Sequence, residues 1–133
     1  MTPSVRVGEP STAAVPVLVV DDDPLILNAF RRMTRDLGVR LLCARSAEEA
    51  PALLELESPA LIICDYQLPG MDGITFLKLA RARYPGARAI LHTGTTQVPP
   101  PELGIGILPK PSGVGEIRAL VESCYPSVKT PIC

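Results

Sequence analysis

The chain has 133 residues, of which 47% are hydrophobic, and its 13 basic residues nearly balance 14 acidic ones. This length can bury one substantial core, but it does not suffice for two ordinary domains. A net charge of -1 offers no general attraction to nucleic acid or anionic lipid, and no apolar stretch approaches the roughly 18 residues that cross a bilayer, so we expect neither a nucleic-acid partner nor a membrane span.

The first 16 residues are rich in Pro, Ser, Thr and Ala and carry no apolar period, which predicts a flexible N-terminal arm over residues 1–16. This arm has little positive charge and no apolar segment, so it is not expected to be a signal peptide. The four cysteines form no CxxC pair and are interpreted as reduced thiols of a cytoplasmic protein. We place one domain at residues 17–124 and a tail at residues 125–133.

The first predicted strand covers residues 15–20, VPVLVV, an unbroken apolar run that is typical of a parallel strand covered on both faces. Three consecutive aspartates follow it, and the third, Asp23, can cap the next helix. Pro24 suits the first turn of that helix, whose apolar residues recur at helical spacing until Gly38 stops it. One strand therefore leads into one helix.

The same unit then repeats along the chain. Residues 40–44 and 60–64 are short apolar runs that predict a second and a third strand. Between them, Ser46 and Glu49 fit a capping box that would open a helix reaching about Leu56. The alternation of strand and helix indicates a parallel sheet.

The second half of the chain continues this alternation. A helix is expected over residues 73–83 with Asp72 as its cap, followed by strands over residues 87–92 and 105–109. Ser112 could cap a last helix. Strands that alternate with helices in this way predict an α/β fold with a doubly wound parallel sheet.

Polar residues occupy the carboxyl ends of the predicted strands, where open α/β sheets hold their sites: Asp21, Asp22, Asp65, Thr93 and Lys110. Crowded carboxylates repel one another unless a cation lies among them, and oxygen ligands without His or Cys favour Mg²⁺. A metal, an ammonium group and a hydroxyl around Asp65 would form an electrostatic cradle for a phosphoryl group transferred onto its carboxylate.

Each of these residues also has a simpler interpretation when it is taken alone. An Asp after a strand is most often a turn former or helix cap. Thr93, before a glycine, is more often a turn residue, and Lys110, between two prolines, is more often a solvated charge. The hypothesis of a site rests on the compatible chemistry at all the strand ends together.

Four blocks resemble the signature of response-regulator receiver domains, in order and over essentially the whole predicted domain: VLVVDDDPLIL (17–27), LIICDYQLPGMDGITFL (61–77), Thr93-Gly94 and Lys110-Pro111. The resemblance implies a flavodoxin-like, CheY-like fold with five parallel strands in the order 2-1-3-4-5. It also implies a phosphoprotein of two-component signalling. The phosphoryl donor would be a sensor histidine kinase or a histidine phosphotransfer protein.

The resemblance assigns a role to each site residue. Asp65 would be the phosphoacceptor, Thr93 would hydrogen-bond a phosphoryl oxygen, and Lys110 would pair with that oxygen. The Lys110-Pro111 bond would be cis. Mg²⁺ would be held by four residues: the side chains of Asp22 and Asp65, the backbone carbonyl of Gln67, and Asp21 through bound water. Gln67 and Thr95 would flank the water that hydrolyses the acyl phosphate.

The chain departs from the receiver pattern between Thr93 and Lys110, which are only 17 positions apart. This segment contains three successive prolines and glycines at positions 104 and 106, which disfavour a helix. We predict that the fourth helix of the pattern is absent or reduced to a single turn. The residue three positions before the lysine, usually aromatic in receivers, is Ile107, so we expect an altered output surface.

The first functional hypothesis is a stand-alone receiver that signals by phosphorylation-dependent protein interaction or phosphorelay, with no enzyme activity beyond its own phosphorylation and dephosphorylation. Residues 125–133 would be an interaction arm that supports a homodimer, or a frayed terminus. His92, the only histidine, is interpreted as a core or rim residue rather than a phosphodonor.

Two other hypotheses stay open. A phosphatase of the haloacid-dehalogenase type also uses an Asp nucleophile with Mg²⁺, but it needs a second Asp two residues later, where this chain has Gln67. A pseudo-receiver would bind partners without phosphorylation. The complete acidic set and Lys110 argue against that interpretation.

Overall fold

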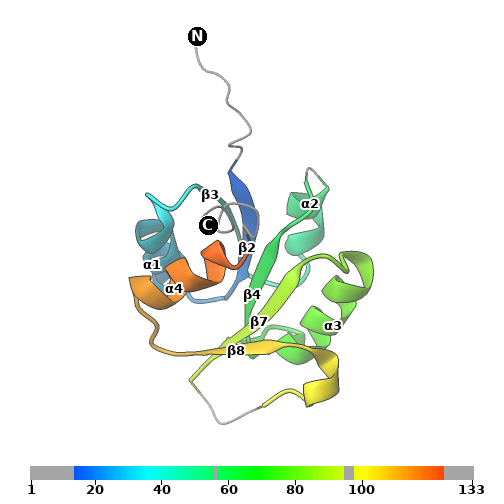
Figure 1. Ribbon diagram of the computed structural model, residues 1–133. Helices are drawn as coiled ribbons and strands as arrows, with labels where there is room; N and C mark the ends of the chain where they lie inside the picture. The colour runs from blue at the N-terminus through cyan, green and yellow to red at the C-terminus, as the bar shows by residue number, and fades with distance from the viewer. Residues whose placement is uncertain (1–13, 56, 95–97, 125–133) are drawn as a thin grey trace.

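A computed structural model describes residues 14–55, 57–94 and 98–124. Its centre is a five-stranded sheet in the order β3-β2-β4-β7-β8, in which all neighbouring strands are parallel (Figure 1). The strands are β2 (Val15–Val20), β3 (Val39–Ala44), β4 (Leu61–Asp65), β7 (Arg88–Thr93) and β8 (Gly106–Pro109). The predicted order 2-1-3-4-5 is therefore confirmed, with β3 and β8 at the edges.

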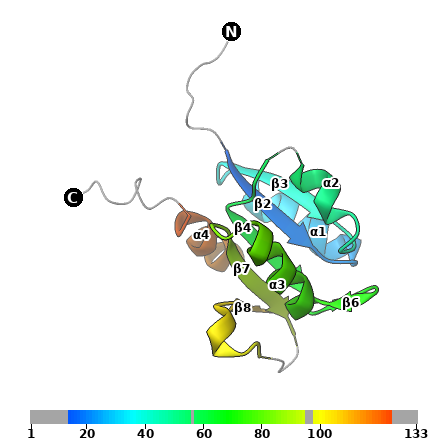
Figure 2. The same ribbon diagram turned by 90° about the vertical axis from the view of Figure 1, so that its right-hand side faces the viewer.

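Helices cover both faces of this sheet. Helices α1 and α4 lie on one face and α2 and α3 on the other, as Figures 1 and 2 show from two directions. In the described part of the chain, no helix combines the length and apolar character of a membrane span. The helical bounds are α1 (Pro24–Thr34), α2 (Ala50–Leu54), α3 (Gly73–Arg83), α4 (Val114–Glu122) and a 3₁₀ turn, η1 (Pro101–Leu103).

The core has two halves, one on each face of the sheet. Along β2, Val17 and Val19 face the half that contains Phe30 of α1, whereas Leu18 and Val20 face the half under α2 and α3. All five of these side chains are essentially buried. Burying an apolar side chain of this size stabilises the fold by about 1.5–3 kcal/mol. This double burial explains the unbroken apolar runs and gives the strand ends a rigid support.

Helix α1 has the predicted cap and an earlier end. The carboxylate of Asp23 accepts a hydrogen bond of 2.9 Å from the backbone N–H of Leu25. The α-helix ends at Thr34, before the predicted stop at Gly38, and the Thr34 hydroxyl donates to the carbonyl oxygen of Phe30 at 2.7 Å. Gly38 has a positive φ of 70° and lies in the turn into β3. The sequence pattern therefore predicted a helix about one turn too long.

Helix α2 begins at Ala50, so the predicted capping box at Ser46 is wrong. A helix opening at Ser46 would place Pro51 in its interior, where a backbone N–H is needed, whereas Pro51 fits the first turn of the helix observed. The Glu49 carboxylate accepts from the backbone N–H of Arg45 at 2.8 Å rather than from Ser46.

Helix α4 begins at Val114, and Ser112 is not its cap, contrary to the prediction. Gly113 occupies the N-cap position, and its backbone N–H donates to the Glu116 carboxylate at 2.7 Å. The Ser112 hydroxyl lies instead near the ring of His92.

The connection from β7 to β8 is short, as predicted. In its described part, residues 94 and 98–105, the only helical element is the 3₁₀ turn η1. Arg81 of α3 holds this turn by donating to the carbonyl oxygens of Leu103 at 2.9 Å and Gly104 at 3.2 Å. Gly104 has a positive φ of 67°, which a residue with a side chain would rarely adopt. Over the residues of this connection that the structure describes, the fourth helix of the receiver pattern is thus reduced to a single turn.

Some predicted boundaries lie outside the described residues. They include residues 1–13 of the predicted arm, Leu56 at the predicted end of the second helix, and residues 125–133 of the tail. Val15 and Pro16, which the prediction assigned to the arm as well as to the first strand, belong to β2.

Candidate functional site

The structure brings the predicted site residues to one rim of the sheet. Asp21 and Asp22 follow β2, Asp65 ends β4, Thr93 ends β7 and Lys110 follows β8. Carboxylate oxygens of the three aspartates lie within 4.8 Å of one another. The Lys110 Nζ atom lies 3.2 Å from Asp21 Oδ2 and 3.1 Å from Asp65 Oδ1, and the Lys110 N–H donates to the Thr93 carbonyl oxygen at 3.0 Å.

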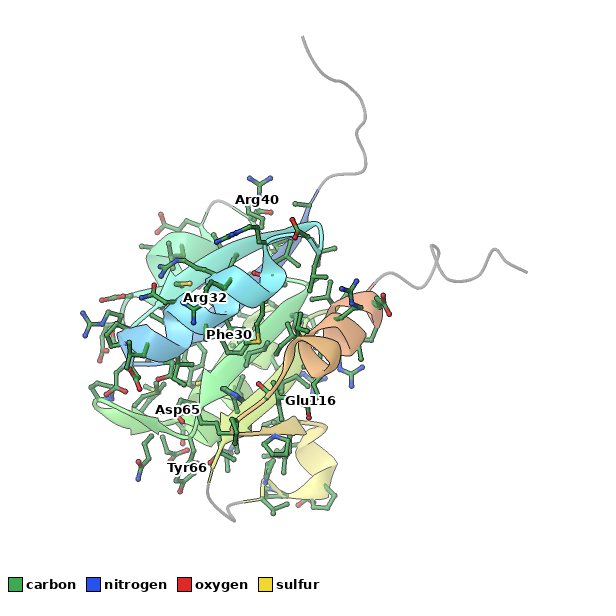
Figure 3. The ribbon with its side chains drawn as sticks, turned by 90° about the vertical axis from the view of Figure 1, so that its left-hand side faces the viewer. Phe30, Arg32, Arg40, Asp65, Tyr66 and Glu116 are labelled. Carbon is green, nitrogen blue, oxygen red and sulfur yellow. The ribbon has the colours of Figure 1, made fainter. Side chains whose placement is uncertain are left out.

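Figure 3 shows Asp65 and the neighbouring Tyr66 at this rim, below helix α1 in that view. Asp65 itself is partly buried, with 14% of its side chain exposed. The chain then forms a small hairpin of β5 (Gln67–Leu68) and β6 (Met71–Asp72), which leads into α3. Gln67, the predicted backbone ligand, is exposed at the start of this hairpin.

Asp21 is the most buried carboxylate of the group, with 1% of the residue exposed. Burial raises its pKa above the ordinary value, and the negative charge of Asp65 adds to this effect. Two contacts act in the opposite direction: the backbone N–H of Asp23 donates to Asp21 Oδ1 at 2.9 Å, and the Lys110 ammonium lies nearby. Ionised Asp21 therefore favours a cation beside it.

Lys110 supplies one positive charge. Burial alone would lower its pKa, but the hydrogen bond to Asp65 and the charge of Asp21 outweigh burial, so the pKa of Lys110 is raised. The ammonium is thus charged over the physiological range. The Lys110-Pro111 peptide bond is cis, as the receiver resemblance implied.

The donor set fits a hard divalent cation. It consists of carboxylate oxygens, with Asp21 buried, Asp65 half-buried and Asp22 exposed. One lysine faces three carboxylates, so the cluster retains net negative charge when all three are ionised. Oxygen ligands of this kind suit Mg²⁺ where phosphate is also bound.

Sequence reasoning missed the importance of Gly73, the first residue of α3. Its backbone N–H donates to the Tyr66 carbonyl oxygen at 2.6 Å. A Cβ atom on Gly73 would overlap the Asp65 carbonyl oxygen and would lie 2.9 Å from the Asp65 carbonyl carbon. The start of α3 is therefore packed directly against the backbone of Asp65. The Asp-Gly pair that opens this helix was the signal in the sequence.

His92 is a core residue, as predicted, with 3% of it exposed. Its ring meets the Phe30 ring edge-on, with centroids 5.3 Å apart and an interplanar angle of 83°. Figure 3 shows Phe30 extending from α1 toward the sheet. The His92 Nε2 atom lies 3.2 Å from the Ser112 hydroxyl. Burial, with a contribution from Lys110, lowers the pKa of His92 to about 4, so the ring is neutral at physiological pH.

Because His92 is neutral in the folded protein, we predict that the protein loses stability in mild acid. His92 takes up a proton near pH 6.5 in the unfolded chain but only near pH 4 in the folded one, so the unfolded state binds more protons between these values. We expect the free energy of unfolding to fall by about 2 kcal/mol from about pH 7.5 to about pH 5 through this group. His92→Gln should remove this part of the pH dependence. Urea unfolding of both proteins at the two pH values measures it, and equal pH dependences would contradict the prediction.

The remaining predicted positions differ in what the structure describes. Ile107, at the position that is usually aromatic in receivers, is 42% exposed on β8. Thr95, expected beside the hydrolytic water, lies outside the described residues.

The family model for the response regulator receiver domain matches residues 17–122. The chain therefore belongs to the response-regulator receiver family. This match covers the five strands apart from the start of β2, and it includes every predicted site residue.

Two curated relatives are transcriptional regulators. The chain is 44% identical over 80 residues to the hydrogenase transcriptional regulatory protein HoxA of Cupriavidus necator, covering 60% of this chain and 16% of HoxA. It is 31% identical over 111 residues to the DNA-binding transcriptional regulator NtrC of Salmonella typhimurium, covering 80% of this chain and 24% of NtrC. The chain thus spans only a small part of these relatives.

Solved receiver structures share the fold over most of the chain. The signal receiver domain of an HD domain-containing protein from Pseudomonas fluorescens Pf-5 has a TM-score of 0.76 and 28% identity, covering 86% of this chain and 96% of that one. The chemotaxis response regulator CheY4 of Vibrio cholerae has a TM-score of 0.71 and 26% identity, covering 84% and 98%.

Proposed function

We propose that the carboxylate of Asp65 accepts a phosphoryl group in a Mg²⁺-dependent reaction, and that the phosphorylated domain signals by protein–protein interaction or passes the group on in a phosphorelay. The observation that carries this proposal is the position of the Asp65 carboxylate, 3.1 Å from the Lys110 ammonium and within 4.8 Å of two further carboxylates. The donor is the phosphohistidine of a sensor histidine kinase or histidine phosphotransfer protein.

The transfer forms one bond and breaks one. A carboxylate oxygen of Asp65 attacks the phosphorus atom, and the bond from phosphorus to the donor imidazole nitrogen breaks, so the electron pair leaves with the imidazole. Asp22, Asp65 and the Gln67 carbonyl, with Asp21 through bound water, would hold Mg²⁺, which would supply charge neutralisation. The protein's own task is positioning and electrostatic stabilisation.

Lys110 and Thr93 would bind oxygens of the phosphoryl group once it is on Asp65. The Lys110 ammonium already contacts the acceptor carboxylate, so it can pair with a phosphoryl oxygen after a small movement. Thr93 ends the neighbouring strand β7, where its hydroxyl would hydrogen-bond another phosphoryl oxygen. Hydrolysis of the acyl phosphate would end the signal, with Gln67 and Thr95 beside the path of the water.

The rest of the proposal follows the receiver assignment. Residues 15–124, which include the whole of β2, act as the signalling domain, and residues 1–14 and 125–133 are proposed to flank it as an arm and a tail. We place the protein in the cytoplasm, where its kinase partners present their phosphohistidine. A homodimer is part of this proposal, as is the lack of an enzyme activity on other substrates.

Incubation with a small phosphodonor such as acetyl phosphate tests the proposal. With Mg²⁺, the intact mass should rise by one phosphoryl group, and chelation of Mg²⁺ by EDTA should prevent the rise. A protein that stays unlabelled with Mg²⁺ under conditions that label a known receiver would overturn the proposal. Sustained turnover of a phosphate monoester would instead favour a phosphatase, although Gln67 provides no second carboxylate to act as its acid.

A further inference from the structure

The loop that carries Lys110 has few backbone attachments. Pro109 and Pro111 have no N–H group, so Lys110 provides the only backbone donor among residues 109–111. That N–H donates to the Thr93 carbonyl oxygen at 3.0 Å. A single hydrogen bond acts as a pivot and does not by itself fix the direction of the Lys110 side chain.

Ser112 provides a second attachment for this loop. Its hydroxyl lies 3.2 Å from His92 Nε2. His92 directly precedes Thr93 in β7, is 3% exposed, and is fixed from the other side by the ring of Phe30. Ser112 makes no cap for α4, because Gly113 occupies the N-cap position of this helix. The Ser112 hydroxyl therefore does not serve as the N-cap of α4 that the sequence suggested.

We infer that His92 and Ser112 form a positioning pair, which holds the Lys110 loop against the strand that ends in Thr93 and so aims the Lys110 ammonium at Asp65. This inference rests on the proposed function, because the aimed ammonium matters most when Asp65 receives a phosphoryl group. Neither member of the pair touches the phosphoryl group. Both act through Lys110.

By placing Lys110, the pair affects how its ammonium group and Mg²⁺ compete for the same carboxylates. The Lys110 ammonium lies 3.2 Å from Asp21 and 3.1 Å from Asp65, which are also the carboxylates expected to hold Mg²⁺. A firmly placed ammonium repels the metal, but it stabilises the incoming phosphoryl group. Releasing the loop should therefore strengthen Mg²⁺ binding and slow phosphorylation. General destabilisation of the fold would weaken both.

Ser112→Ala in the full chain tests the pair, with Ser112→Thr as the matched control that keeps a hydroxyl. For Ser112→Ala we expect the Kd for Mg²⁺, measured by isothermal titration calorimetry, to fall roughly 3-fold, and the rate of labelling by acetyl phosphate to fall roughly 3-fold, as suits the loss of one neutral hydrogen bond. Ser112→Thr should restore both values. If the Kd for Mg²⁺ and the labelling rate of Ser112→Ala both stay at the wild-type values, the inference is wrong. It is also wrong if Mg²⁺ binding becomes weaker while labelling becomes slower.

His92→Leu and the double variant with Ser112→Ala complete a cycle. If the two residues act only through their contact, the double variant should label no more slowly than the slower single variant, whereas independent, additive losses would contradict the pair. The Mg²⁺ titration requires no phosphorylation. Absence of labelling in the wild-type protein would therefore defeat the proposed function, whereas wild-type labelling with an unchanged Ser112→Ala would defeat only the pair.

Discussion

Asp65→Asn should reduce phosphoryl labelling by acetyl phosphate and Mg²⁺ to background. The amide has nearly the shape of the carboxylate but is not a nucleophile, so the acyl phosphate cannot form. It also removes one negative charge from the cluster of three carboxylates, so Mg²⁺ should bind more weakly. Intact-mass spectrometry and a Mg²⁺ titration measure the two effects separately.

Asp72→Asn is the matched control for this change. Asp72 lies in the same connection and is an exposed carboxylate, which caps α3 by accepting from the Thr75 N–H at 2.8 Å. Because Asn caps a helix about as well as Asp, this variant should keep its stability and its labelling. Labelling that persists in Asp65→Asn, or that is lost equally in Asp72→Asn, would contradict the assignment of Asp65 as acceptor.

Gly73→Ala should lower the stability of the protein and disturb the acceptor. The added Cβ would overlap the Asp65 carbonyl oxygen, so the start of α3 and the backbone after β4 must move apart. Inserting atoms into a tightly packed place costs about 1–3 kcal/mol. Since the same backbone carries Asp65, we also expect slower labelling at protein concentrations and temperatures where the variant remains folded. Urea unfolding and the labelling rate measure these effects.

Gly115→Ala is the control for Gly73→Ala, because we expect it to keep stability and labelling. Gly115 lies in α4, and a Cβ there would have nothing within 4 Å. Alanine in a helix is favoured over glycine by about 0.5–1 kcal/mol, so this variant should be as stable as the wild type or more so, with unchanged labelling. If Gly73→Ala were as well tolerated as Gly115→Ala, the close packing against Asp65 would be of no consequence.

The sequence predicted the sheet well because its three central strands, β2, β4 and β7, are buried on both faces. Runs such as residues 15–20 and 60–64 admit few alternatives, and the strand-helix alternation predicted a doubly wound parallel sheet. The order of the strands came from the resemblance to receiver domains. Helix ends were harder to predict, since several nearby residues can compete for the same cap. Ser46 and Ser112 both resembled caps. However, α2 begins at Ala50, with Pro51 in its first turn, and at the start of α4 the Glu116 carboxylate accepts from the Gly113 N–H.

The residue types of the candidate site were also predictable, because parallel strands must place their carboxyl ends on one rim. The contacts that support the site were not, since they join positions far apart in the chain. Arg81 reaches the turn at Leu103, and His92 reaches Ser112, 20 positions away. No local pattern marks such pairs. They depend on how distant parts of the folded chain pack against one another.

Strand β8 limits how another molecule can approach this side of the sheet. It is an edge strand of four residues and ends in Pro109, which has no N–H to offer. Short edges that contain proline resist extension of the sheet by a further strand. A partner at this edge would therefore have to recognise side chains, such as the exposed Ile107, rather than the backbone. The same property protects the folded protein from edge-to-edge aggregation.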